Sequence, residues 1–357
     1  MQFRKLVLSL CLGLACGLTA LAPPAQACST FCLTGPSGPV FGKNYDWSIG
    51  HGAVLINPRG KAKVASIPAG GNPARWISRY GSVTFNQYGR EMPNGGLNEA
   101  GLVVEILWLD ETRYPASDDR AELEQLQWIQ YQLDTRATVP EVLAADAEVR
   151  IRPRPGVPVH FFVADRAGRV AAIEFLDGKM VAHTGKDLPV PALTNTVYAD
   201  ALAAWKRTGA QLGGSSEARF TRAAERVRSA RVTTASEAVR YAFDTLSDVT
   251  HRSHTMWSLV YEPAAGRVWF RTRDHRPIRS IDLARLDFAC SAPPKGLDLE
   301  ARLEGDVTER FTRFGTSENL ALVRRSVRAT PFLKSMPDPA IEAVARYPDS
   351  LACSAAP

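Results

Sequence analysis

The order of strand-like and helix-like blocks along the chain is the feature that most constrains its fold. Short β-type runs bounded by turn residues predict strands at 29–33, 39–44, 53–57, 83–88 and 101–109, with turns at 94–96 and 98–101. Apolar residues at helical spacing then predict helices over 120–133 and from about residue 138. Strands are predicted next at 159–164, 170–175 and 179–183, helices at 199–207, 217–228 and 234–246, and strands at 256–262, 267–273 and 278–283.

This order is typical of an α+β domain in which two antiparallel sheets are layered with helices. No internal repeat and no Gly/Ser/Pro linker divides the chain. We therefore expect one domain over residues 28–345 and a C-terminal tail over 346–357. The weakly helical pattern after about residue 300 does not indicate where that part of the chain lies.

The first 27 residues have the three parts of a signal peptide. Arg4 and Lys5 give a positive start, residues 6–21 are apolar, and residues 25–27 read Ala-Gln-Ala. Ala25 at the −3 position does not fit a lipidation signal, and no later apolar run approaches the ~20 residues of a membrane-spanning helix. We expect an exported, periplasmic or secreted protein without a membrane anchor.

Cleavage after Ala27 makes Cys28 the first residue of the mature chain. One residue then carries both a thiol and a free α-amine, whose ordinary pKa of about 8 lets it act as a base near neutral pH. Cys28 is thus a candidate nucleophile with its own proton acceptor. The alternative is a structural disulfide, as is common for cysteines in exported proteins.

Cysteine usage and charge exclude several other classes. Cleavage leaves Cys28, Cys32, Cys290 and Cys353, without a C-x-x-C spacing, so no metal or other cofactor is expected. A bridge between Cys290 and Cys353 is one possibility, and Cys32 is expected to be a buried thiol. The net charge of +6 falls to about +4 without Arg4 and Lys5, which gives no indication of nucleic-acid binding.

Five short patches after Cys28 resemble the choloylglycine hydrolase family, which includes conjugated bile acid hydrolases and penicillin V acylases. They are FGKNYDW at 41–47, GGLNEAGL at 95–102, LTN at 193–195, RFTR at 219–222 and VWFRTR at 268–273. The resemblance implies the four-layer αββα fold of N-terminal nucleophile hydrolases. It also implies cleavage of a small-molecule linear acyl amide through a thioester on Cys28, no cofactor, and a possible homotetramer.

The resemblance assigns roles to polar residues around Cys28. Asp46 would bind the α-ammonium group, although a turn-capping Asp is the alternative. Lys43, where most relatives have Arg, would lower the thiol pKa by its charge but cannot make a two-pronged contact; otherwise it is a surface Lys. Asn195 would donate to the oxyanion of a tetrahedral intermediate.

The remaining assignments leave alternatives open. Many relatives have Asn where this chain has Trp108, whose backbone N–H would still serve the oxyanion hole. Trp47 and Trp108 together are similar to the aromatic pair of the Gram-negative penicillin V acylases and either line the acyl pocket or belong to the core. Arg219 and Arg222 share one helix face at i, i+3 spacing, and the sequence does not indicate which lies near the nucleophile.

Other functions fit the sequence less well. A papain-like enzyme needs a histidine partner, but none of the six histidines is accompanied by the corresponding cysteine motif. A conjugated bile salt hydrolase and a non-enzymatic exported binding protein remain alternatives. The two tryptophans and the leader favour a penicillin V acylase or N-acyl homoserine lactone acylase, acting on phenoxyacetyl or fatty-acyl amides.

Overall fold

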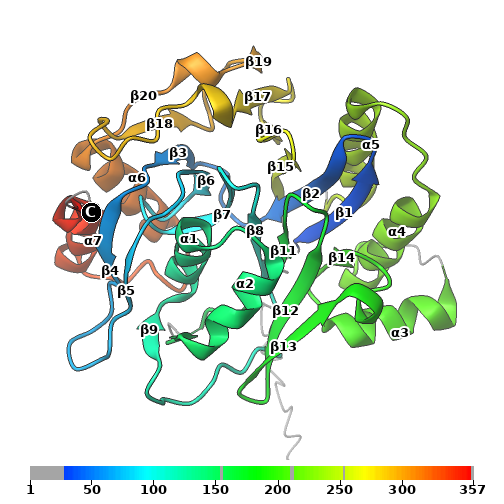
Figure 1. The fold of residues 1–357 in the computed structure, drawn as a ribbon, viewed down its shortest axis with the longest axis horizontal. Helices are drawn as coiled ribbons and strands as arrows, with labels where there is room; N and C mark the ends of the chain where they lie inside the picture. The colour runs from blue at the N-terminus through cyan, green and yellow to red at the C-terminus, as the bar shows by residue number, and fades with distance from the viewer. Residues whose placement is uncertain (1–27, 153–155, 210–212, 252–253, 355–357) are drawn as a thin grey trace, which may run out of the picture.

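Two large sheets form the centre of the protein (Figure 1). The computed structural model describes residues 28–152, 156–209, 213–251 and 254–354, so the predicted signal peptide lies outside the described residues. The first sheet has seven strands, in the order β14 (Ala192–Leu193), β1 (Ser29–Gly35), β2 (Gly38–Asp46), β15 (Thr255–Glu262), β16 (Arg267–Thr272), β17 (Arg279–Asp282) and β19 (Gly305–Asp306).

The second sheet has nine strands, all antiparallel to their neighbours. Their order is β13 (Lys179–Thr184), β12 (Val170–Leu176), β11 (Val159–Ala164), β8 (Val103–Trp108), β7 (Pro93–Asn98), β6 (Ser82–Asn86), β3 (Ala53–Asn57), β18 (Lys295–Asp298) and β20 (Thr312–Arg313). In the seven-stranded sheet only β17 and β19 pair in parallel.

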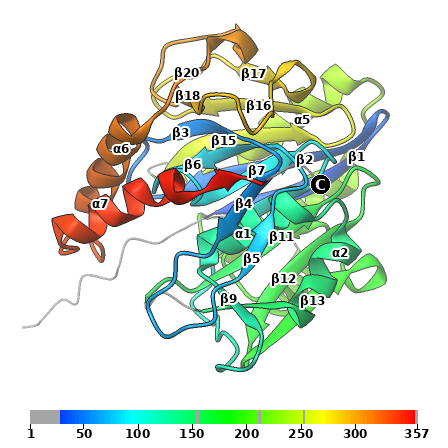
Figure 2. The same ribbon diagram turned by 60° about the vertical axis from the view of Figure 1, so that its left-hand side comes forward.

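Helices cover both outer faces, which completes the four predicted layers (Figures 1 and 2). α3 (Tyr198–Thr208), α4 (Ser216–Ser229) and α5 (Ala235–Asp248) lie on the side of the seven-stranded sheet, and α1 (Gln125–Thr135) and α2 (Val139–Ala144) on that of the nine-stranded sheet. Fully buried aromatic side chains fill the space between the sheets, among them Phe41, Phe85, Phe162 and Tyr261. The predicted αββα arrangement is confirmed.

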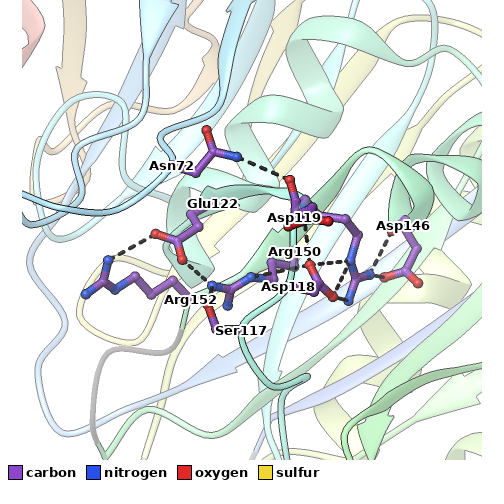
Figure 3. A network of polar contacts seen from close by, with 9 residues as sticks. Asn72, Ser117, Asp118, Asp119, Glu122, Asp146, Arg150 and Arg152 are labelled. Atoms are coloured by element: carbon purple, nitrogen blue, oxygen red, sulfur yellow. Dashed lines mark hydrogen bonds and ion pairs between the residues drawn. The ribbon is translucent and has the colours of Figure 1, made fainter.

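A charged network supports the chain just before α1 (Figure 3). Here β9 (Ala121–Leu123) pairs with β10 (Val149–Ile151), so the helix predicted over 120–133 begins only at Gln125. On β9, Glu122 forms ion pairs with Arg150 and Arg152. Three residues that pair across adjacent strands satisfy their backbone groups without a helical turn, which explains the late start of α1.

The sequence also predicted a turn at 94–96 that is in fact strand β7. Glycines at these positions let neighbouring groups approach the backbone closely. A Cβ atom on Gly95 would lie 2.2 Å from the Glu105 side chain, and one on Gly96 would lie 2.4 Å from the Val83 carbonyl oxygen. The glycines therefore serve close packing and not chain reversal.

The C-terminal segment folds back onto the body of the protein (Figure 2). α6 (Thr316–Ala329) and α7 (Asp338–Arg346) pack on each other through a small core that includes Val323, Val327 and Ile341. After α7, β21 (Ala352–Cys353) joins β4 (Lys61–Val64) and β5 (Arg75–Ile77) in a three-stranded sheet. Cys353 forms a disulfide with Cys290, which establishes the pairing left open by the sequence.

Five short 3₁₀ helices complete the secondary structure of the described residues: Ala145–Ala147, Gly185–Asp187, Leu283–Arg285, Thr308–Arg310 and Tyr347–Ser350. Among the described ranges, no helix is both long enough and apolar enough to cross a lipid bilayer.

Candidate active site

Cys28 lies immediately before β1, at the end of the seven-stranded sheet. Pairing of Ser29 with Asn44 brings it beside the end of β2. Its side chain is buried, and Sγ lies 3.9 Å from the backbone oxygen of Asp46. Burial raises the pKa of the Cys28 thiol above its ordinary value, and the positive charge of Lys43 offsets this only in part. The thiol is therefore protonated at neutral pH and needs a base before it can attack.

Lys43 is fully buried between the sheets and is not a surface residue. Its ammonium group donates a hydrogen bond to the Ile106 carbonyl and lies 3.9 Å from a Glu105 carboxylate oxygen. Glu105 also accepts a 2.6 Å hydrogen bond from the Tyr261 hydroxyl, and burial raises its pKa to about 7. Lys43 lowers the thiol pKa in the predicted direction, but desolvation outweighs it, so the expected thiolate is not favoured.

Asp46 is completely buried at the end of β2. The Thr255 hydroxyl donates a hydrogen bond to its Oδ1, whereas Oδ2 has no hydrogen-bond partner among the described residues. Burial raises the pKa of Asp46 to about 7, against the lowering effects of Arg219 and Thr255. A buried carboxylate oxygen without a donor is costly, which makes this atom a suitable acceptor for an additional cation or N–H group near Cys28.

Arg219 connects Cys28 with Asn195. From α4 its Nη1 donates to the Cys28 carbonyl oxygen at 2.5 Å and to Ser29 Oγ at 2.7 Å, and its Nη2 donates to Asn195 Oδ1 at 3.0 Å. Because a guanidinium group only donates, it holds the oxygen of the Asn195 amide towards itself. The structure therefore places Arg219 at the nucleophile.

The Asn195 amide nitrogen, on the other side, donates to the Trp108 carbonyl at 2.8 Å. The N–H and C=O of one residue in a strand point to the same edge, so the Trp108 N–H also faces the side on which Asn195 lies. The two residues predicted as oxyanion donors are thus in contact, and Arg219 links Asn195 to the Cys28 carbonyl oxygen.

Arg222 is not part of this arrangement. One helical turn further along α4, its guanidinium group donates to the carbonyl oxygens of Asp248 at 2.9 Å and Gly213 at 2.7 Å. It shares a helix face with Arg219, as the spacing indicated, but it contacts the C-terminal end of α5 and the loop before α4. The structure does not bring Arg222 to the thiol.

A cavity of about 950 Å³, counting the space that is open to solvent, lies beside Cys28. Its lining is mostly apolar and includes both predicted tryptophans, whose ring centroids are 6.0 Å apart. The carboxyl end of β8 and the residues around the start of α1 form other parts of the lining. Trp47 and Trp108 are partly buried, and each lines the cavity while it also packs against a hydrophobic core cluster.

Sequence reasoning missed Thr255, Glu174 and the C-terminal part of the cavity. Glu174 is a fully buried residue of β12 that accepts a 2.9 Å hydrogen bond from the Tyr198 N–H, at the start of α3 and three residues after Asn195. His160 and His183 contact its carboxylate, and although burial opposes ionisation, these contacts lower the pKa of Glu174 to about 2. Glu174 is a charged residue within the otherwise apolar strand predicted at 170–175, and this could have indicated a buried polar contact.

Together these groups suit acyl transfer. Cys28 and Asp46, whose Oδ2 has no hydrogen-bond partner among the described residues, line the apolar cavity, and Arg219 links the Cys28 carbonyl to the Asn195 amide. Such a site can position an amide, accept its carbonyl oxygen during attack and accommodate an apolar acyl group.

Comparisons with known proteins agree with this chemistry. Residues 28–196 match the profile of the linear amide C–N hydrolases, choloylglycine hydrolase family. Penicillin V acylase of Pectobacterium atrosepticum is 27% identical over 325 residues, covering 76% of this chain and 85% of that protein. The structure of penicillin V acylase from Agrobacterium tumefaciens has a TM-score of 0.70 at 27% identity, covering 80% of this chain and 97% of that one.

A mutant of conjugated bile acid hydrolase from Clostridium perfringens shares the fold, with a TM-score of 0.63 at 15% identity, covering 78% of this chain and 98% of that one.

Proposed function

Because the chain belongs to the choloylglycine hydrolase family and is a hydrolase of linear amide C–N bonds, we propose that it is an exported acylase that works through a thioester on Cys28. The observation that carries the proposal is the buried Cys28 thiol, 3.9 Å from the backbone oxygen of Asp46, together with the buried Asp46 carboxylate, whose Oδ2 has no hydrogen-bond partner among the described residues. A free α-amine on Cys28 supplies both the base that the thiol needs and the cation that Asp46 needs.

In the first half-reaction the Cys28 amine accepts the thiol proton, directly or through a water molecule. The sulfur then forms a bond to the carbonyl carbon of the amide. Asn195 and the Trp108 N–H donate to the resulting oxyanion, a contribution that is worth about 3 kcal/mol per donor in comparable sites. The C–N bond breaks as the ammonium group returns its proton to the leaving nitrogen.

In the second half-reaction water gives a proton to the amine and attacks the thioester carbon. Collapse of this second intermediate releases the acid and restores the thiol. Asp46 keeps the ammonium form paired while the proton resides on the amine.

The same proposal makes removal of residues 1–27 a condition of activity. Before cleavage the Cys28 nitrogen belongs to a peptide bond with Ala27, and an amide nitrogen is not a base at neutral pH. The precursor is therefore inactive, and export precedes catalysis.

For the substrate we propose a phenoxyacetyl or fatty-acyl amide. The apolar cavity and its Trp47–Trp108 wall support an acyl group that is flat or linear. Both penicillin V acylases are more similar in sequence to this chain, at 27% identity, than the bile acid hydrolase at 15%, which shows the fold alone.

The test uses the mature chain that begins at Cys28, with hydrolysis rates measured on penicillin V, N-acyl homoserine lactones of several chain lengths and glycocholate. Cys28→Ala should abolish turnover, and mass spectrometry of quenched wild-type reactions should find the acyl group on Cys28. Cys32→Ala is the matched control, because Cys32 is the other buried free cysteine. Full amidase activity in Cys28→Ala would contradict the mechanism, and faster hydrolysis of glycocholate would overturn the substrate preference.

A further inference from the structure

One wall of the cavity beside Cys28 comes from the C-terminal segment. We call residues 316–346, which comprise α6, the connection after it and α7, the C-terminal hairpin. Its residues in the cavity wall are Val323, Val327, Phe332, Leu333, Met336 and Val344. All of them are apolar, so this wall offers surface to an acyl group but no polar contact to the reacting amide.

Phe332 brings this wall to the two tryptophans. Its ring centroid is 6.4 Å from that of Trp47 and 6.3 Å from that of Trp108, and the tryptophan centroids are 6.0 Å apart. Trp47 follows β2, Trp108 ends β8 and Phe332 lies between α6 and α7. Three segments distant in sequence thus form one aromatic cluster, which requires the C-terminal hairpin in place.

A chain of hydrogen bonds fixes this geometry. The Trp47 indole N–H donates to the Tyr88 hydroxyl at 2.9 Å, which lies 3.0 Å from Thr330 Oγ1. Thr330 in turn donates to the Ser326 carbonyl at 2.8 Å, so its oxygen accepts from Tyr88. The orientation of Trp47 is therefore coupled to the end of α6, two residues before Phe332.

The Phe332 side chain is nevertheless unusually open to solvent. It is 43% exposed, and Ile77 and Ile278 are the other large apolar side chains exposed to a similar extent among the described residues. Of the three, only Phe332 lines the cavity beside Cys28. An apolar ligand that reaches this ring would cover surface that the folded protein leaves in contact with water, which favours binding.

We propose that Phe332 is a specificity-determining residue, which packs on the distal part of the acyl group and makes the enzyme prefer long or aromatic acyl amides. The inference rests on the proposed function, because it places the acyl carbonyl at Cys28. A short acyl group ends before the aromatic cluster and gains nothing from Phe332. A long one covers the ring and at the same time contacts Trp47 and Trp108.

The test compares Phe332→Ala with the wild type on butanoyl, octanoyl and dodecanoyl homoserine lactones. The kcat/KM for the dodecanoyl substrate should fall about tenfold, mainly through KM, because the lost contact is equivalent to one or two methylene groups. The value for the butanoyl substrate should stay unchanged. Phe332→Leu should recover part of the loss, and Ile278→Ala, an exposed apolar residue away from the cavity, should have no effect.

A second measurement does not depend on turnover. In a Cys28→Ala background, binding of dodecanoate is followed by tryptophan fluorescence, and Phe332→Ala should weaken it about tenfold. Equal losses for all acyl lengths, or unchanged dodecanoate binding, would overturn the inference. A wild-type chain that hydrolyses no amide, yet binds dodecanoate through Phe332, would refute the proposed function and leave the role of Phe332 established.

Discussion

Thr255 donates its hydroxyl proton to one carboxylate oxygen of Asp46, and the other oxygen of Asp46 has no partner among the described residues. The Thr255 oxygen accepts a 3.0 Å hydrogen bond from the His251 N–H, so its proton is committed to Asp46. An irregularity in the pairing of β15 with β2, between Thr255 and Trp257, puts the hydroxyl in this position. A bulge next to a reactive group is a common way to redirect a side chain.

Replacement of Thr255 by Val should therefore impair catalysis without loss of substrate binding. The shape of the side chain is kept, but Asp46 loses the donor that fixes its rotation, and we expect kcat to fall about tenfold with little change in KM. Thr255→Ser keeps the hydroxyl and is the matched control. Steady-state kinetics measure both constants. A change in KM with an unchanged kcat would contradict the positioning role of Thr255.

The same variant should also change the pH dependence. The Thr255 hydrogen bond lowers the pKa of Asp46, so its loss raises that pKa and moves the acidic limb of the kcat/KM profile to higher pH. The Ser variant should retain the wild-type limb. A pH profile that is identical in all three proteins would show that Asp46 does not titrate in the working enzyme.

Arg219 and Arg222 should differ sharply in their effect on activity. Arg219→Lys keeps a positive charge but cannot bridge the Cys28 carbonyl and Asn195, so we expect kcat to fall about a hundredfold through a mobile oxyanion donor. Arg222→Lys loses only contacts to two backbone carbonyls and should stay within about twofold. Similar losses in both variants would show that α4 acts on the site as a whole.

Asp46→Asn should change the free energy of unfolding differently in the precursor, which retains residues before Cys28, and in the mature chain. With Ala27 retained, Asp46 faces an amide, and its pKa of about 7 lies above the ordinary 3.8. A raised carboxylate pKa makes ionisation a cost to folding that grows as the pH rises from about 4 to about 7 and remains above it. Near pH 8 the Asn variant of this extended chain should be more stable than its parent, by about 2–4 kcal/mol.

In the mature chain the free ammonium group pairs with Asp46, and the advantage of Asn should disappear or reverse. Urea unfolding of the four proteins at about pH 5 and pH 8 measures the difference. If Asp46→Asn stabilises both forms equally, the α-amine does not pair with Asp46.

Glu174 gives a stability effect of the opposite sign. Its folded pKa of about 2 lies below the ordinary 4.5, so the ionised form stabilises the fold above about pH 4.5, and this contribution is lost as the pH falls towards 2. Glu174→Gln should cost about 2–3 kcal/mol near pH 6 and much less near pH 3, measured by urea unfolding. A constant cost at both values would indicate lost packing and not lost charge.

The layered fold was predictable because most strands and helices carry a clear local pattern. The runs at 53–57 and 159–164 became β3 and β11 with the predicted bounds, and the helix predicted over 217–228 became α4. The strand β9 was missed because its partner β10 lies far along the chain and three residues have no detectable period. β7 was missed because Asn-Gly-Gly is typical of a turn, and the sequence does not show which residues of adjacent strands pack against these glycines.

The candidate site was predictable where motifs are local and unpredictable where the fold joins distant segments. Cys28, Asp46 and Asn195 stand in short recognisable patches, whereas Thr255 is a hydroxyl residue in a strand whose role depends on a pairing irregularity. Arg219 and Arg222 lie on the same face of a predicted helix. Only the packing of α4 in the structure shows which of them reaches Cys28. The C-terminal hairpin has amphipathic helices but no motif, so nothing in the sequence connects it to Cys28.

The disulfide between Cys290 and Cys353 closes a loop that contains the whole C-terminal hairpin. The two cysteines are 63 positions apart, and closing a loop of this length removes about 4 kcal/mol of chain entropy from the unfolded state. One wall of the cavity thus lies in a segment that the disulfide closes, and in the proposed mechanism proteolysis releases the nucleophile. Under the proposed function, a chain that stays in a reducing compartment with residues 1–27 attached lacks both the disulfide and the free α-amine, so activity and full acyl selectivity are expected only after export.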